Sequence, residues 1–197
     1  MARPREFDID KAVRDAADVF WEKGYNDASL HDLLAGMKLT RGSLYKAFGD
    51  KKSLYLKVLA YYEQIAVDAA VARLTEPGVP DGRRRIIGLF KAVQRATEAG
   101  DRRGCILCTA ATGQEMRDPE IASVIQTGLR RIRDAIEQAL IASPLHTGLT
   151  PPKRAVLANA LMTQYVGLRV LARSCLPLGI VEQSGQAVDA LLAAHEG

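Results

Sequence analysis

Apolar residues recur every three or four positions along most of the chain, and the first such stretch covers residues 8–24. This spacing is typical of an amphipathic α-helix. Asp8 or Asp10 can cap its start, and Gly24 can end it. Its apolar face consists of Ile9, Ala12, Val13, Ala16, Ala17 and Phe20. The pattern therefore predicts a helix over residues 8–24, preceded by a short basic arm, Arg3-Pro4-Arg5.

Residues 29–52 predict two short helices around a tight turn, followed by the start of a third helix. Ser29 is suited to cap the first helix, whose apolar face holds Leu30, Leu33 and Leu34. Met37-Lys38-Leu39 is too short to form anything but a turn. Thr40 can cap the second helix, with Leu44, Ala47 and Phe48 facing inward. This is a helix-turn-helix arrangement, in which the second helix enters the major groove of DNA.

The rest of the chain also has the period of helices. A long helix is predicted over residues 51–75, and its inward face would hold Leu54, Val58, Tyr61, Tyr62, Ile65 and Ala69. After a Pro/Gly-rich break at residues 77–82, five further helices are expected: one ending at Gly100, then 105–116, 118–143, 150–175, and one from about Val181. The helix over 150–175 is apolar on most sides, so it needs burial from two sides. The expected fold is all-α, with about nine helices.

The helix-turn-helix segment resembles the TetR (tetracycline-repressor-like) family of transcriptional regulators. The resemblance is carried by Thr40-Arg41-Gly42-Ser43-Leu44-Tyr45, then Phe48, then Asp50-Lys51-Lys52, and it covers roughly residues 8–55. One position departs from the family pattern: the family usually has Gly in the turn, where this chain has Lys38, and its own glycine is Gly36. A non-glycine residue with positive φ costs about 1 kcal/mol. Either Lys38 tolerates this conformation, or the turn has another shape.

The resemblance implies a helix-turn-helix DNA-binding domain over residues 1–55 and a helical ligand-binding and dimerisation domain over residues 56–197. It implies a homodimer formed through the last two helices, bound to double-stranded DNA at a palindromic operator. The two recognition helices of such a dimer lie about 34–36 Å apart. The implied function is repression that a small-molecule effector relieves.

Basic side chains are concentrated around the expected recognition helix. Between Gly36 and Val58 there are six Lys or Arg residues against one acid, Asp50, which favours contact with phosphates, although a solvated charged face is the alternative. Arg41 is expected to read bases, and Ser43 and Lys46 to contact bases or backbone. Gly42 allows close approach of the partner. Phosphate contacts are expected from Ser29, Thr40, Tyr45 and Lys51. The arm at residues 3–5 is either a further DNA contact or a disordered terminus.

Two cysteines lie at the start of the helix expected over residues 105–116. A helix dipole stabilises a nearby thiolate, and Arg102 and Arg103 would add to this effect. Through Arg103-Gly104-Cys105 the chain resembles TetR-like regulators that carry Gly-Cys at this place, some of which respond to electrophiles or oxidants. Cys105 is thus either a redox sensor, with Cys108 or Cys175 as resolving partner, or one of two small buried hydrophobic residues.

An effector pocket is expected among the helices from Arg83 to Arg173. Its expected lining residues are Phe90, Val93, Cys105, Met162 and Tyr165, although residues of these types are more often plain core.

Other classes of function find little support. We expect no enzyme, because no Gly-rich phosphate loop, no Gly-x-Ser-x-Gly and no His-Glu-x-x-His is present. We expect no metal and no cofactor, because His31, His146 and His195 do not stand at ligand spacing from the cysteine pair. No signal peptide is evident, and we expect no apolar run that approaches the ~18 residues of a membrane span. The expected location is cytoplasmic.

Overall fold

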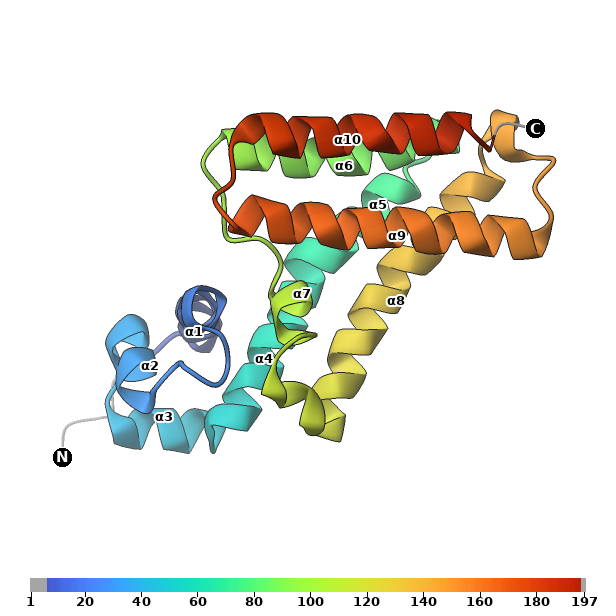
Figure 1. Cartoon of the computed structure of the whole chain (residues 1–197). Helices are drawn as coiled ribbons and strands as arrows, with labels where there is room; N and C mark the ends of the chain where they lie inside the picture. Colours follow the sequence, from blue (N-terminus) through green and yellow to red (C-terminus); the bar gives the residue numbers. More distant parts are fainter. Residues whose placement is uncertain (1–6, 196–197) are drawn as a thin grey trace.

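The computed structural model describes residues 7–195, and all regular structure in this part is helical (Figure 1). The expected all-α class is confirmed. The basic arm at residues 3–5 lies outside the described residues. The helices are α1 (Ile9–Lys23), α2 (Leu30–Met37), α3 (Arg41–Phe48), α4 (Lys51–Tyr62), η1 (Glu63–Val67), α5 (Asp68–Leu74), α6 (Gly82–Glu98), α7 (Ile106–Ala110), η2 (Gln114–Arg117), α8 (Pro119–Ile141), η3 (Pro144–His146), α9 (Pro151–Arg173) and α10 (Leu178–Ala193).

The first four helices begin where side chains can satisfy the free N–H groups of the first turn. In each case the side chain of the N-cap residue accepts a hydrogen bond from the backbone N–H three residues further on. These N-cap residues are Asp8, Ser29, Thr40 and Asp50. At Ser29 the bond is reciprocal, since the Asp32 carboxylate accepts the Ser29 backbone N–H at 2.9 Å. The helix starts near the recognition segment are therefore set by local sequence.

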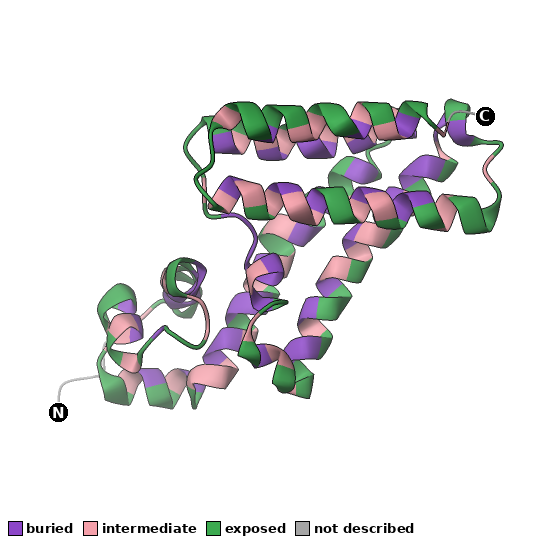
Figure 2. Ribbon diagram, viewed as in Figure 1, coloured by how far each residue is buried: buried purple, intermediate pink, exposed green. Residues whose placement is uncertain are grey.

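The helices form a small cluster and a larger bundle joined by α4. The cluster of α1, α2 and α3 lies at one end, where α1 packs on α2 and α4 (Figure 1). At the other end α6, α9 and α10 run side by side, and α5 and α8 extend from them toward the start of α4. The buried residues follow the inward faces of these helices from the cluster into the bundle (Figure 2).

The long helix after residue 51 contains a turn of π-helix that the sequence analysis missed. Leu54, Val58 and Tyr62 are buried as expected, but Ile65 is 45% exposed and Ala69 is also exposed. After η1 the buried positions are Val67, Ala70 and Leu74 instead. A π-turn closes on i→i+5 bonds, so it inserts about one extra residue and rotates the following face. The expected inward face was therefore wrong beyond residue 62.

Two helix boundaries also differ from expectation. The helix expected over 105–116 ends at Ala110, and a bend and the 3₁₀ turn η2 follow it. At Gly113 an added Cβ would lie 2.1 Å from Glu115 Oε2, so the chain turns tightly there around a buried carboxylate. The last helix begins at Leu178, three residues before the expected Val181.

Helix α9 is long and apolar enough, by length and composition alone, to cross a membrane, so the expectation of no such run was wrong. In this fold it packs against α6, α8 and α10. Only 33% of its most apolar 18-residue stretch is buried. Val156 and Val170 remain 66% and 51% exposed. One apolar side of α9 is therefore uncovered in the single chain.

Candidate functional site

The turn between α2 and α3 accommodates a lysine in the left-handed conformation. Lys38 has φ 54° and ψ 39°. The backbone N–H of Lys38 donates to the carbonyl of Ala35 at 3.3 Å, and the N–H of Leu39 donates to that of Leu34 at 3.1 Å. These bonds satisfy carbonyls that the end of α2 would otherwise leave free. Of the two alternatives, the turn thus keeps the positive φ and Lys38 takes it.

The outer face of α3 is exposed and basic. Leu44 and Phe48 are buried, which leaves Arg41, Gly42, Tyr45 and Lys46 exposed and Ser43 half-buried. The Arg41 guanidinium carbon lies 5.7 Å from the centre of the Tyr45 ring. The two side chains therefore occupy one side of the helix together, in a cation–π contact.

Gly42 and Gly36 have different surroundings. A Cβ added to Gly42 would meet no atom within 4 Å, and this residue has no positive φ. A Cβ added to Gly36 would lie 2.5 Å from Val19 Cγ2, so Gly36 allows α2 to pack closely on α1. The fold of the single chain requires Gly36 but gives no reason for Gly42.

The hydroxyl groups expected to contact DNA are also used inside the protein. Ser29 Oγ lies 2.6 Å from the Asp32 carboxylate and caps α2. Thr40 Oγ1 accepts the Ser43 backbone N–H at 3.2 Å and lies 3.0 Å from Ser43 Oγ. Each hydroxyl therefore holds a helix start in place while lying at the surface.

The two lysines at the start of α4 have partners within the chain. Lys51 Nζ donates to the carbonyl of Asn26 at 3.3 Å and lies 4.8 Å from the centre of the Tyr25 ring, and burial lowers the pKa of Lys51. Lys52 Nζ pairs with Asp118 at 2.7 Å and Glu120 at 3.0 Å, which raises the pKa of Lys52. Lys52 thus links α4 to α8 through two acids that lie outside residues 36–58, so the count of charges within that segment did not include them.

Comparison with known proteins supports a helix-turn-helix at α2 and α3. The profile described as "Bacterial regulatory proteins, tetR family" matches residues 13–58, which contain α2, the turn and α3. The chain is 31% identical over 142 residues to the uncharacterized HTH-type transcriptional regulator YezE of Bacillus subtilis (strain 168), covering 72% of each chain. The chain belongs to the TetR family. It is a DNA-binding transcriptional regulator, as the sequence analysis expected.

Two solved structures have the same fold over nearly the whole chain. One is a cysteine mutant of the TetR family transcriptional regulator CifR complexed with 26-base-pair operator DNA, which is 29% identical, with a TM-score of 0.80 over 98% of this chain and 99% of that one. Another is the reduced form of Escherichia coli NemR, 19% identical, with a TM-score of 0.76 over 91% and 93% of the two chains, and it shows the fold alone. The double-stranded operator DNA in the first of these structures is a partner of CifR.

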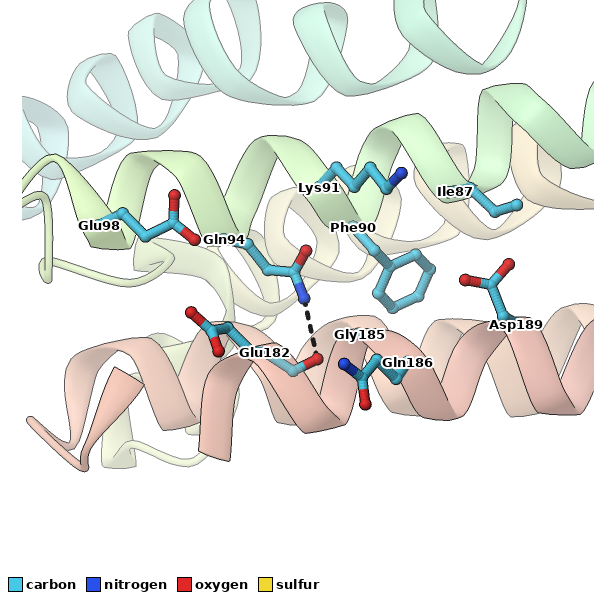
Figure 3. Close-up of a pocket in the computed structure, with 9 residues that line it drawn as sticks. All are labelled: Ile87, Phe90, Lys91, Gln94, Glu98, Glu182, Gly185, Gln186 and Asp189. Carbon is cyan, nitrogen blue, oxygen red and sulfur yellow. Dashed lines mark hydrogen bonds between the residues drawn. The ribbon is translucent and has the colours of Figure 1, made fainter. Parts of the chain in front are cut away.

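The structure divides the expected effector residues between two places. Val93 and Tyr165 line a cavity of about 240 Å³ between η1, α5, α6 and α9, which we call the Arg169 cavity. Phe90 instead lines a groove between α6 and α10 (Figure 3). Cys105 is buried, and Met162, half-buried on α9, belongs to neither of these two linings.

The groove in Figure 3 is a seam between two packed helices. Gln94 Nε2 donates to the carbonyls of Val181 and Glu182 at 3.3 and 3.2 Å. A Cβ added to Gly185 would lie 1.8 Å from Gln94 Nε2, so the glycine lets α10 approach this side chain. The seam fastens α10 to α6, and its polar walls offer little apolar surface to a ligand.

Cys105 and Cys108 are both buried. The charged residue that acts on both thiols is Arg169, which the sequence analysis did not name. The Cys108 thiol lowers the pKa of Cys105, an effect that Arg169 and the Tyr62 hydroxyl reinforce and burial opposes. The same interaction raises the pKa of Cys108. The expected contribution of Arg102 and Arg103 was wrong, because Arg102 donates to the Leu176 carbonyl and Arg103 pairs with Asp101 and Asp18.

Arg169 could not be recognised from its sequence neighbours. It lies in the apolar stretch of α9, and its partners, the Tyr62 hydroxyl at 3.3 Å and the Gly104 carbonyl, are 107 and 65 residues away. No motif connects these positions, so tertiary packing alone brings them together.

Proposed function

We propose that this regulator is a homodimeric repressor, released from a palindromic operator when a small-molecule effector enters the helical bundle. The exposed, basic outer face of α3 carries this proposal. It presents a guanidinium, a phenol and an ammonium group around a glycine for which the single chain gives no structural reason. A surface of this kind suits insertion into a major groove. We also propose that the protein is cytoplasmic, because a bacterial regulator of this family meets its operator DNA there.

The proposed DNA contacts divide by chemistry. Arg41, held over the Tyr45 ring, reads a guanine, and Ser43 and Lys46 contact bases or backbone. Ser29, Thr40 and Tyr45 contact phosphates from the edge of the same surface. Lys51 gives one of its three N–H groups to the Asn26 carbonyl and has two others for phosphate.

The proposed dimer forms through α9 and α10. Val156, Val170, Leu176 and Ile180 are large apolar residues that remain exposed on these two helices and the loop between them. A second copy would cover them, which meets the requirement of α9 for burial from two sides. We propose residues 1–55 as the DNA-binding domain and 56–197 as the effector and dimerisation domain, with α4 continuing across the boundary.

The test is binding of selected operator and random DNA over a range of salt concentrations. We expect Arg41→Ala to weaken operator binding by about 1–3 kcal/mol and to relax sequence preference. Lys51→Ala should weaken binding to all sequences alike and lower the salt slope by about 1. Equal losses on operator and random DNA for Arg41→Ala would contradict the assigned role of this residue.

A second candidate, a thiol-sensing repressor, is favoured by the lowered pKa of Cys105 beside Cys108 and Arg169. A thiolate is the reactive form of cysteine. An oxidant that accepts two electrons would join Cys105 and Cys108 in a disulfide, with release of two protons. Operator binding before and after diamide treatment tests this function, because a Cys105→Ser protein that still releases DNA on oxidation would contradict it.

A further inference from the structure

We propose that the Arg169 cavity binds a small apolar monocarboxylate, with the carboxylate received by Arg169 and the apolar body by the wall of the cavity. The inference rests on the proposed effector control and names the chemical class of the effector.

The wall of the cavity is mostly apolar, and four of its residues are alanines. It is formed by Trp21, Ile65, Ala66, Ala69, Ala70, Arg73, Leu89, Ala92, Val93, Asp101, Tyr165 and Arg169. The volume of about 240 Å³ suits a small molecule rather than an extended one. The two guanidinium groups outnumber the one carboxylate, and Asp101 already pairs with Arg103 at 3.0 Å. The cavity therefore combines an apolar body with an excess of positive charge.

Arg169 is half-buried and has no carboxylate partner among the described residues. It donates instead to the Tyr62 hydroxyl and the Gly104 carbonyl. The Nε atom of Arg169 is buried and has no hydrogen-bond acceptor among the described residues. The same is true of Nε1 of Trp21, which also lines the cavity. Partly buried charges and buried N–H groups without partners are costly. An anion at this end of the cavity would offset the cost of the Arg169 charge.

The π-turn η1 forms part of the cavity wall. It displaces Ile65 and Ala69 from the core face, and both residues line the cavity. A single π-turn inside an α-helix frequently occurs at a functional site, because it re-aims side chains without ending the helix. Here the change of register turns Ile65 and Ala69 toward the cavity, where they form part of its apolar wall.

Binding of an anion at Arg169 has a consequence for Cys105. The positive charge of Arg169 is one of the causes that lower the pKa of the Cys105 thiol. A carboxylate would neutralise this charge and raise the pKa of Cys105 again. The thiol should then react more slowly with an alkylating agent when the cavity is occupied.

The test uses the full chain and the fluorescence of Trp21, the only tryptophan. Benzoate and hexanoate are titrated against benzamide and hexanamide, which have similar shapes and no charge. We expect a saturable change with the carboxylates and binding about tenfold or more weaker with the amides. The rate of Cys105 alkylation by iodoacetamide in Cys175→Ser protein should fall as benzoate saturates. Equal binding of acids and amides, or no saturation by either acid, would overturn the proposal.

Variants locate the site. Arg169→Met should abolish the preference for the acids, and Arg169→Lys should retain part of it. Ala92→Leu fills the cavity and leaves Arg169 in place, so it keeps the test valid if Arg169→Met does not fold. Arg130→Ala, an exposed arginine on α8, is the matched control and should bind as the parent does. Unchanged acid binding in Ala92→Leu would overturn the assignment.

Operator binding separates this inference from the proposed function. If benzoate binds in the cavity and the operator stays bound, the site stands and effector control by it is wrong. If neither acid binds and the operator is still released by another small molecule, the proposed function stands and the carboxylate inference is wrong.

Discussion

Arg173, the last residue of α9, donates to the backbone carbonyl of Trp21, 152 residues earlier in the chain, at 2.8 Å. The same guanidinium donates to the carbonyls of Glu22 at 3.0 Å and Arg103 at 2.9 Å. The first two carbonyls belong to the last turn of α1, where backbone acceptors lack partners within the helix. Arg173 thus joins the first helix of the DNA-binding segment to α9 and to the loop before Cys105. Through these hydrogen bonds a movement of α9 would act directly on α1.

Replacement of Arg173 measures this contact. Arg173→Met should lower the free energy of unfolding by about 2 kcal/mol, because several hydrogen bonds from a charged donor are lost. Arg102→Met is the matched control, since among residues 7–195 Arg102 donates only to the Leu176 carbonyl, at 3.1 Å, and it should cost less than about 1 kcal/mol. Urea denaturation of both variants gives the difference. Equal losses would show that Arg173 has no special role in docking α1.

Gly42 and Gly36 should respond oppositely to the same substitution. Gly42→Ala should leave the fold intact, or stabilise it by about 0.5 kcal/mol, because alanine favours helix and the added methyl meets no neighbour. Operator affinity should fall about tenfold or more, because the methyl holds α3 away from the groove.

Gly36→Ala should lower stability by about 1–3 kcal/mol, because Val19 must move. Thermal unfolding and operator titration of both proteins check these results. Unchanged operator affinity in Gly42→Ala would place this residue outside the interface.

The turn residue Lys38 should be improved by glycine. Lys38→Gly should raise the free energy of unfolding by about 1 kcal/mol, because the residue has φ 54° and glycine adopts this conformation without a Cβ clash. Lys38→Ala is the control, since it removes the charge and keeps the Cβ, and it should give no gain. Denaturant unfolding compares the three proteins. A gain of the same size in Lys38→Ala would assign the effect to charge rather than to backbone strain.

Acid should weaken the segment that begins at Ser29. The Lys23 ammonium, 2.6 Å away, and the Ser29 hydroxyl and N–H hold the pKa of Asp32 well below its usual value. A lowered folded-state pKa stabilises the protein above the unfolded-state pKa of about 3.9, and this stabilisation is lost as the pH falls below it.

Unfolding measured between about pH 5 and pH 2 tests this expectation. Asp32→Asn should flatten the fall in stability over this range, and Lys23→Met should reduce it, because it removes the largest cause. Identical pH profiles for the parent and Asp32→Asn would refute the assignment.

Local sequence determined the recognition segment. The caps at Ser29 and Thr40 lie three residues from the backbone N–H groups that they accept, and the apolar positions of α2 and α3 need only the helical period to be placed. Such interactions act within one helical turn, so the sequence alone shows them. For the same reason the helix-turn-helix and the all-α class follow from the pattern of residues along the chain.

Tertiary structure decided the parts that depend on contacts between distant segments. The π-turn at residues 63–67 rotates the helix that continues from α4, although the spacing of its apolar residues allowed a regular helix. Lys52 pairs with α8, and Arg169 comes to lie between Tyr62 and the loop at Gly104. Whether a charged side chain faces solvent, an ion partner or a cavity depends on what packs against it. Such contacts arise only when the helices pack together, so they cannot be predicted from the sequence of one helix.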